Sequence, residues 1–152
     1  MSEQTSGSQF RLVVLLLAIG VLPSVGVGAS VAMIGIIFSL QFAWLAPLIG
    51  AVCGLMVRFM SPGASVAKCS VAAILAAVGF GIGAIVRGGL KIAIELAESP
   101  SVVLSNMDWS LAHYLLMASL RSDRWVSLVV TVVLAFLLVK VEIKSKSGQQ
   151  TA

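Results

Sequence analysis

Long apolar segments alternate with short polar ones along the chain. No charged residue occurs in 12–57, in 69–86 or in 126–139. One helix over the first of these segments would be about 69 Å long, more than twice the ~30 Å hydrocarbon core of a bilayer. The chain must therefore turn inside that segment, and the pattern predicts several apolar helices, each near the length of one membrane crossing.

Two breakpoints compete within the first apolar segment. A turn at 23–28 would leave a preceding helix of only about 16 Å, which is too short to span. A turn at 39–44 combines polar side chains with a tryptophan that favours the membrane interface, ahead of a proline suited to an early helical position. We therefore expect the first helix to continue past the first breakpoint, with a kink where Pro23 lies near Gly26 and Gly28.

The segment that follows residue 86 is amphipathic. Arg87–Gly89 closes or bends the preceding helix, and Leu90–Glu98 then carries its charges at helical spacing on one face. We interpret it as a helix that lies on the membrane or continues the preceding one. Ser105 stands before Asp108 with the spacing of a capping box, which opens a second amphipathic stretch. For 105–120, an interfacial or re-entrant helix is favoured over a fifth crossing.

The predicted fold class is all-α: an integral membrane protein with four transmembrane helices plus one or two interfacial amphipathic helices. The predicted organisation is a disordered tail at 1–10, a single transmembrane helical domain at 11–141 and a disordered tail at 142–152. Within the domain, spans are expected at 11–40, 44–60, 66–86 and 125–141, with the interfacial segment at 90–120.

The composition agrees with this class and excludes several others. The chain is 59% hydrophobic and 11% charged, whereas soluble domains are roughly 45–50% apolar and ~25% charged. It has too few charges to cover a soluble globule and too few polar residues to be disordered. A soluble enzyme, a nucleic-acid-binding module and a flexible linker are therefore excluded.

The charges beside the spans predict the orientation. With four spans, both chain ends and the 58–68 turn share one side, which carries six cations and two carboxylates, whereas the other side carries four of each. Because cytoplasmic connections carry an excess of Lys and Arg, we expect both termini in the cytoplasm and the protein in the plasma membrane, as in a bacterial inner membrane. The six cations are Arg11, Arg58, Lys68, Lys140, Lys144 and Lys146.

Small residues recur at helical spacing on the second and third predicted spans. Such residues let helix backbones approach closely in lipid, where van der Waals contact replaces the hydrophobic effect. Because a short turn joins these helices, the simplest expectation is that their small-residue faces pack against each other. The alternative is an oligomer or partner interface. The residues of these faces are Gly50, Gly54, Ala73, Ala76, Gly79 and Gly83.

The spans lack the residues that most membrane chemistry requires. Proton relays, charge-coupled pumps and voltage sensors use ionisable side chains inside the membrane, and the three uncharged segments have none. One histidine and two separated cysteines do not make a zinc site. Asp108, Ser110 and His113 are residue types of a catalytic triad, but they share one short segment and are interpreted as its polar face. We therefore expect no enzyme, no metal site and no cofactor.

The residues around the second predicted span form a recognisable pattern. Gly50, Gly54, Val57 and Arg58 are followed by a turn at 61–65 and then by the Ala- and Gly-rich third span. This pattern resembles small, largely uncharacterised bacterial four-span membrane proteins. The resemblance implies a four-helix membrane architecture and no particular substrate. The chain departs from the pattern in having a single basic residue before the turn, where a denser basic stretch is common.

Two functional hypotheses follow. The first is a non-enzymatic membrane subunit or scaffold that associates through small-residue helix faces. Its expected partners are the lipid bilayer and either copies of itself or a larger membrane complex, and not nucleic acid. The alternative is a transporter or channel component for a neutral or apolar solute, because a helix broken at Pro23, Gly26 and Gly28 would expose backbone groups to a substrate.

Overall fold

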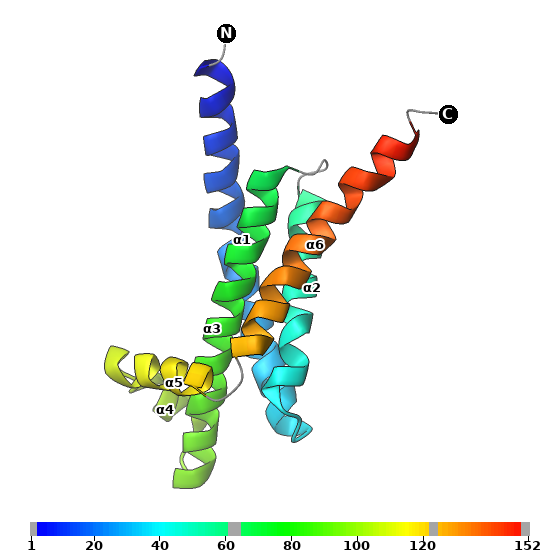
Figure 1. Cartoon of the computed structure of the whole chain (residues 1–152). Coiled ribbons are helices and arrows are strands. Elements are labelled where there is room, and N and C mark those ends of the chain that lie inside the picture. The colour runs from blue at the N-terminus through cyan, green and yellow to red at the C-terminus, as the bar shows by residue number, and fades with distance from the viewer. Residues whose placement is uncertain (1–2, 61–64, 122–124, 150–152) are drawn as a thin grey trace.

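The computed structural model describes residues 3–60, 65–121 and 125–149, and helices account for most of them (Figure 1). The turn predicted at 61–65 and the boundary between 121 and 125 fall largely outside these described residues. The elements are α1 (Glu3–Ile37), α2 (Phe42–Met60), α3 (Val66–Leu96), α4 (Pro100–Ser105), α5 (Trp109–Arg121) and α6 (Trp125–Gln149).

Three helices are long and apolar enough to cross a membrane. They are the Val13–Ile37 part of α1, the whole of α2 and the whole of α3. A fourth crossing is counted only if α5 and the Trp125–Lys140 part of α6, which are bent by 90° to each other, form one broken span. The chain is therefore an all-helical protein, in the part that the structure describes, with helices suited to a membrane.

The bounds of α1 and α6 differ from the predicted ones at both ends of the chain. α1 runs through Pro23 without a break and ends at Ile37, so the chain turns beside Ser39, whose φ of 53° is left-handed. The same helix begins at Glu3, and α6 ends at Gln149, inside segments for which the sequence predicts disorder. Extending a helix that has already formed adds one hydrogen bond per residue fixed, so polar ends can prolong it.

α3 continues to Leu96 instead of ending at residue 86, which corrects the predicted third span. The amphipathic segment after residue 89 is thus a continuation of α3, one of the two alternatives. The glycine pair does not end the helix because both members are packed. A Cβ built on Gly88 would lie 2.8 Å from Leu115 Cδ2, and one built on Gly89 would lie 2.9 Å from Leu104 Cδ2.

Side-chain caps begin α3 and α5. Ser65 Oγ accepts a hydrogen bond of 3.3 Å from the Lys68 backbone N–H. Asp108 Oδ1 accepts one of 2.8 Å from the Leu111 backbone N–H at the start of α5. The predicted capping box is therefore wrong in its first member, because Ser105 belongs to α4 and its hydroxyl bonds within that helix. The Asp108 side chain thus accepts from one of the free N–H groups at this helix start.

The long helices form two parallel pairs, α1 with α3 and α2 with α6 (Figure 1). Gly79 of α3 faces the Ser24 carbonyl of α1, and four residues later Gly83 faces the Gly28 carbonyl. Since both partners advance by four residues, the two helices run in the same direction. Helices that follow each other along the chain are antiparallel, so each tight pair joins alternate long helices.

The apolar core lies among these four helices. The largest fully buried side chains include Phe80, Ile49, Leu75 and Val57. The Phe42 and Phe80 rings are tilted, with centroids 5.3 Å apart, in a geometry that aromatic pairs favour. α4 and α5 lie against α3 towards the end of the bundle opposite the two chain ends (Figure 1). The bundle therefore has two distinct ends.

Candidate functional site: helix-packing faces and a surface helix

α1 and α3 are in backbone contact along a face of small residues. A Cβ built on Gly28 would lie on the carbonyl oxygen of Gly79, and one built on Gly83 would lie 2.8 Å from the Gly28 carbonyl oxygen. The Cβ position of Gly79 is 2.9 Å from the Ser24 carbonyl oxygen. One α-hydrogen of each glycine therefore points at a carbonyl oxygen of the other helix, the arrangement of Cα–H···O contacts. Only residues without a Cβ allow backbones to approach this closely.

α2 and α6 meet in the same manner. A Cβ built on Gly50 would lie on the carbonyl oxygen of Thr131. Four residues later on both helices, the Cβ position of Gly54 is 2.9 Å from the Ala135 carbonyl oxygen. The two glycines of the GxxxG motif of α2, Gly50 and Gly54, are thus both in contact with the backbone of α6.

Two hydroxyl side chains of α6, Ser127 and Thr131, find hydrogen-bond acceptors within this pair. Ser127 Oγ donates a hydrogen bond of 3.0 Å to the Ala43 carbonyl oxygen of α2, which links the two helices directly. Thr131 is fully buried, and its Oγ1 donates 2.7 Å to the Ser127 carbonyl oxygen of its own helix. Both hydroxyls thus have an acceptor in a region where an unsatisfied donor would be costly.

The four glycines among the predicted packing residues lie at helix contacts, but their partners differ from the prediction. The expected mutual packing is wrong for the α2 face, which contacts α6. The α3 face contacts α1 and also receives two α2 side chains, since Ile49 Cγ2 lies 2.8 Å from the Cβ position of Gly79 and Phe42 Cζ lies 2.9 Å from that of Gly83. Ala73 is half-buried. The buried members are Gly50, Gly54, Ala76, Gly79 and Gly83.

Two further small-residue faces complete the pairs, and sequence reasoning missed both. They carry the same signal, a small or short side chain at every fourth position. On α1 a serine and an alanine alternate with the two glycines, and on α6 the face contains no glycine, so neither contains a GxxxG motif. All are buried: Gly20, Ser24, Gly28 and Ala32 on α1, and Ser127, Thr131 and Ala135 on α6.

The three residues predicted as a kink have different surroundings. Pro23 is exposed, and Gly28 is buried against α3. Gly26 is exposed, with nothing within 4 Å of its Cβ position. Between them Ser24 Oγ donates 2.8 Å to the Val21 carbonyl oxygen, so its hydroxyl already has a partner. The helix continues through all of these residues.

Arg87 joins α3 to the connection between α1 and α2. Its Nη2 donates a hydrogen bond of 3.0 Å to the Leu40 carbonyl oxygen. Its guanidinium carbon lies 5.8 Å from the centroid of the Phe42 ring, within the range of a cation–π contact. The sequence marks this arginine only as a boundary, whereas the structure gives it a role in closing one end of the bundle.

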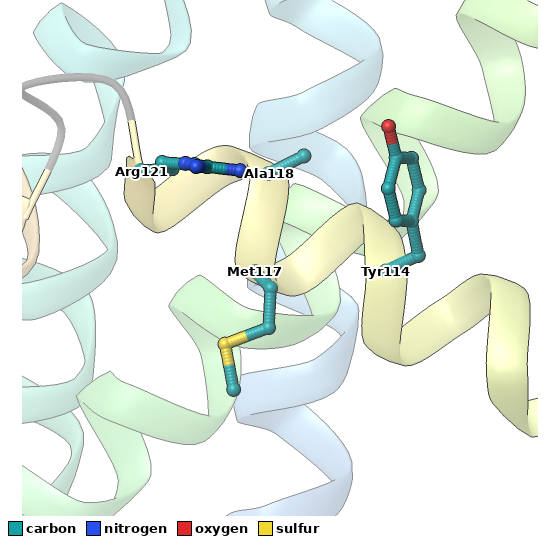
Figure 2. A pocket seen from close by; sticks show the side chains of 4 residues that line it. All are labelled: Tyr114, Met117, Ala118 and Arg121. Carbon is teal, nitrogen blue, oxygen red and sulfur yellow. The ribbon is translucent and has the colours of Figure 1, made fainter.

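One face of α5 packs on the helix bundle, and the opposite face is exposed. Leu115 contacts Gly88 of α3, and Leu116 and Leu120 pack on the core. The outer face forms a shallow hollow of about 440 Å³, here called the α5 shelf. Figure 2 shows the Arg121 side chain lying along the helix towards Ala118, with the Tyr114 ring beyond it and Met117 on the other side of the helix. The shelf is lined by Tyr114, Met117, Ala118 and Arg121.

The polar residues noted in the sequence lie apart from any metal-binding cluster in the described ranges. Within the described ranges, no group of three or more His, Cys, Asp or Glu side chains is placed to hold a metal ion. Asp108 is a helix cap, and Ser110 and His113 are exposed on α5. Comparisons with protein-family models, curated proteins and solved structures find no match for the chain.

Proposed function

We propose that the chain is a non-enzymatic integral membrane protein with four spans, a subunit or scaffold that associates through the outward face of α1. In this proposal α6 is the fourth span, the α5 region is interfacial, and both chain ends are in the cytoplasm of a bacterial cell. The observation that carries the proposal is a contrast between glycines. Most of the glycine faces are in contact with neighbouring helices of the same chain, whereas Gly26 on α1 has open space beside it.

The topology is supported by how helices and charges are arranged. α6 packs parallel to α2, so it runs across the same depth of the bundle as a helix that is itself long enough to span. The start of α1 and the end of α6 lie at the same end of the bundle (Figure 1). That end carries the excess of cations, as cytoplasmic ends do.

The association surface is supported by the surroundings of the glycines. Neighbouring helices of the same chain occupy the space beside four glycines, which are Gly50, Gly54, Gly79 and Gly83. Gly26, in contrast, has open space at its Cβ position. A glycine inside a helix costs about 1 kcal/mol relative to alanine, and a close helix partner in the membrane offsets such a cost.

A second observation on α1 points to the same face. Ser30 stands four residues after Gly26 and is also exposed. The two form a small-xxx-small pattern at positions of α1 that the other described helices leave exposed. A serine hydroxyl at this depth can bond across to a partner helix.

The alternative, a transporter or channel component for a neutral solute, has less support. It needs backbone groups freed by a broken α1. The helix is continuous, the Ser24 hydroxyl bonds to Val21, and Gly28 is closed against α3.

Two measurements on the full chain test the proposal. The first is chemical crosslinking in native membranes with a reagent that does not react with cysteine, and the second is sizing in mild detergent. We expect an oligomer or a larger complex that Gly26→Leu dissociates, because the added side chain separates the helices. Gly26→Ala should retain association, and Ser70→Leu, at an exposed position of α3, is the control for added bulk. A strict monomer without partners, or association indifferent to Gly26→Leu, would contradict the proposal.

A further inference from the structure

The α5 shelf differs from the apolar surface around it in its chemistry. Arg121 and Tyr114 are both exposed, and they stand seven residues apart, two helical turns, on the same outer face. Ala118, between them, is too small to fill the gap, so a hollow remains (Figure 2). A cation and a hydroxyl donor thus flank one space.

This donor set favours a phosphate oxygen. A guanidinium presents N–H groups in a planar fork that matches phosphate, and a phenol hydroxyl adds a further donor. None of the four lining residues carries a carboxylate. Asp108, at the other end of α5, has Oδ1 occupied by the Leu111 N–H. The described lining of the hollow is therefore complementary in charge to an anion.

The apolar surroundings distinguish a lipid from a free ion. Met117 lines the same hollow and is half exposed, which offers apolar contact beside the polar donors. Trp109, earlier on the helix, is largely exposed, and tryptophan favours the headgroup level of a membrane. A helix with an apolar inner face and this outer face suits the boundary between headgroups and acyl chains.

We propose that the α5 shelf binds the phosphate of an anionic membrane phospholipid, with Arg121 and Tyr114 as donors and Met117 against the start of an acyl chain. The site rests on the proposed function only in locating α5 at a membrane surface. It is independent of the α1 association face.

Native mass spectrometry of the full chain in detergent, titrated with phosphatidylglycerol or phosphatidylcholine, tests the site. We expect phosphatidylglycerol to bind more tightly, and Arg121→Gln to lower its affinity about fivefold, the loss expected for one cation near a lipid surface. Tyr114→Phe should lower the affinity by a smaller factor, and Arg121→Lys should retain part of the binding. Lys91→Gln, at an exposed position of α3, is the matched control and should leave the affinity unchanged.

Three results would overturn the site: equal binding by wild type and Arg121→Gln, an equal loss in Lys91→Gln, or displacement of the lipid by an equal concentration of inorganic phosphate. The last would assign the hollow to a free anion instead of a lipid. Because binding is measured on the detergent-solubilised chain with and without Gly26→Leu, failure of this site is distinguishable from failure of the α1 association face.

Discussion

At Gly28 and Gly50 the space that a side chain would fill is occupied by a carbonyl oxygen of the neighbouring helix. Backbone atoms cannot rotate away as the end of a flexible side chain can. At Gly20, by contrast, the nearest atoms belong to the Leu75 side chain, which has other rotamers. The demand for glycine is therefore strictest where backbone meets backbone.

This contrast predicts opposite results for two alanine substitutions on one helix. Gly28→Ala should lower the free energy of unfolding by about 1–3 kcal/mol, because its methyl group forces α1 away from α3. Gly26→Ala should leave that free energy unchanged or raise it by up to about 1 kcal/mol, since its Cβ enters open space and alanine favours the helix. Unfolding by sodium dodecyl sulfate in mixed micelles measures both, and equal destabilisation would contradict the packing described.

At the scale of elements, a hydroxyl hydrogen bond between helices distinguishes the α2–α6 pair, because the Ser24 hydroxyl of α1 bonds within its own helix. The Ser127 hydroxyl bonds to α2, whereas the Thr131 hydroxyl bonds within α6. Ser127→Ala should lower the free energy of unfolding by about 0.6 kcal/mol, a typical value for a hydrogen bond between membrane helices. Thr131→Val keeps the volume and loses only a bond within its own helix, so its effect should be smaller. The same micelle titration measures the two, and the reverse order would count against the Ser127–Ala43 link.

The elements show what the sequence can specify and what it cannot. Charge and hydropathy locate helices because an apolar segment has few alternatives in a membrane. They do not specify which face of α2 meets which neighbour, because a short connection fixes adjacency without fixing rotation about the helix axis. The GxxxG motif of α2 is visible in the sequence, but its partner face on α6 contributes the backbone of Thr131 and Ala135 and contains no glycine.

The sequence left the continuation of α3 as one of two alternatives for a related reason. Two consecutive glycines after Arg87 normally end or weaken a helix. Here Gly88 and Gly89 provide room for leucines of α5 and α4, so the packing of distant segments outweighs the local preference. The α5 shelf likewise depends on which face of α5 rests on α3, which its sequence alone leaves open.

For the molecule as a whole, the arrangement of the helices and the distribution of charge both support the proposed four-span topology. In the two tight parallel pairs, α1 and α3 run in one direction, and α2 and α6 run in the other. Between α3 and α6, the chain passes through α4 and α5. Arg87 and Leu40 then close the end that carries α5. The opposite end holds both chain ends and the excess of cations.

The most direct test of this account is the side of the membrane on which each chain end lies. Impermeant labelling of tags at the N-terminus, at the C-terminus and between Ser99 and Pro100 should be done on sealed bacterial spheroplasts and after permeabilisation. We predict that both terminal tags are labelled only after permeabilisation and that the internal tag is labelled at once. A C-terminal tag that is labelled on sealed spheroplasts while the N-terminal tag is protected would contradict the four-span bundle.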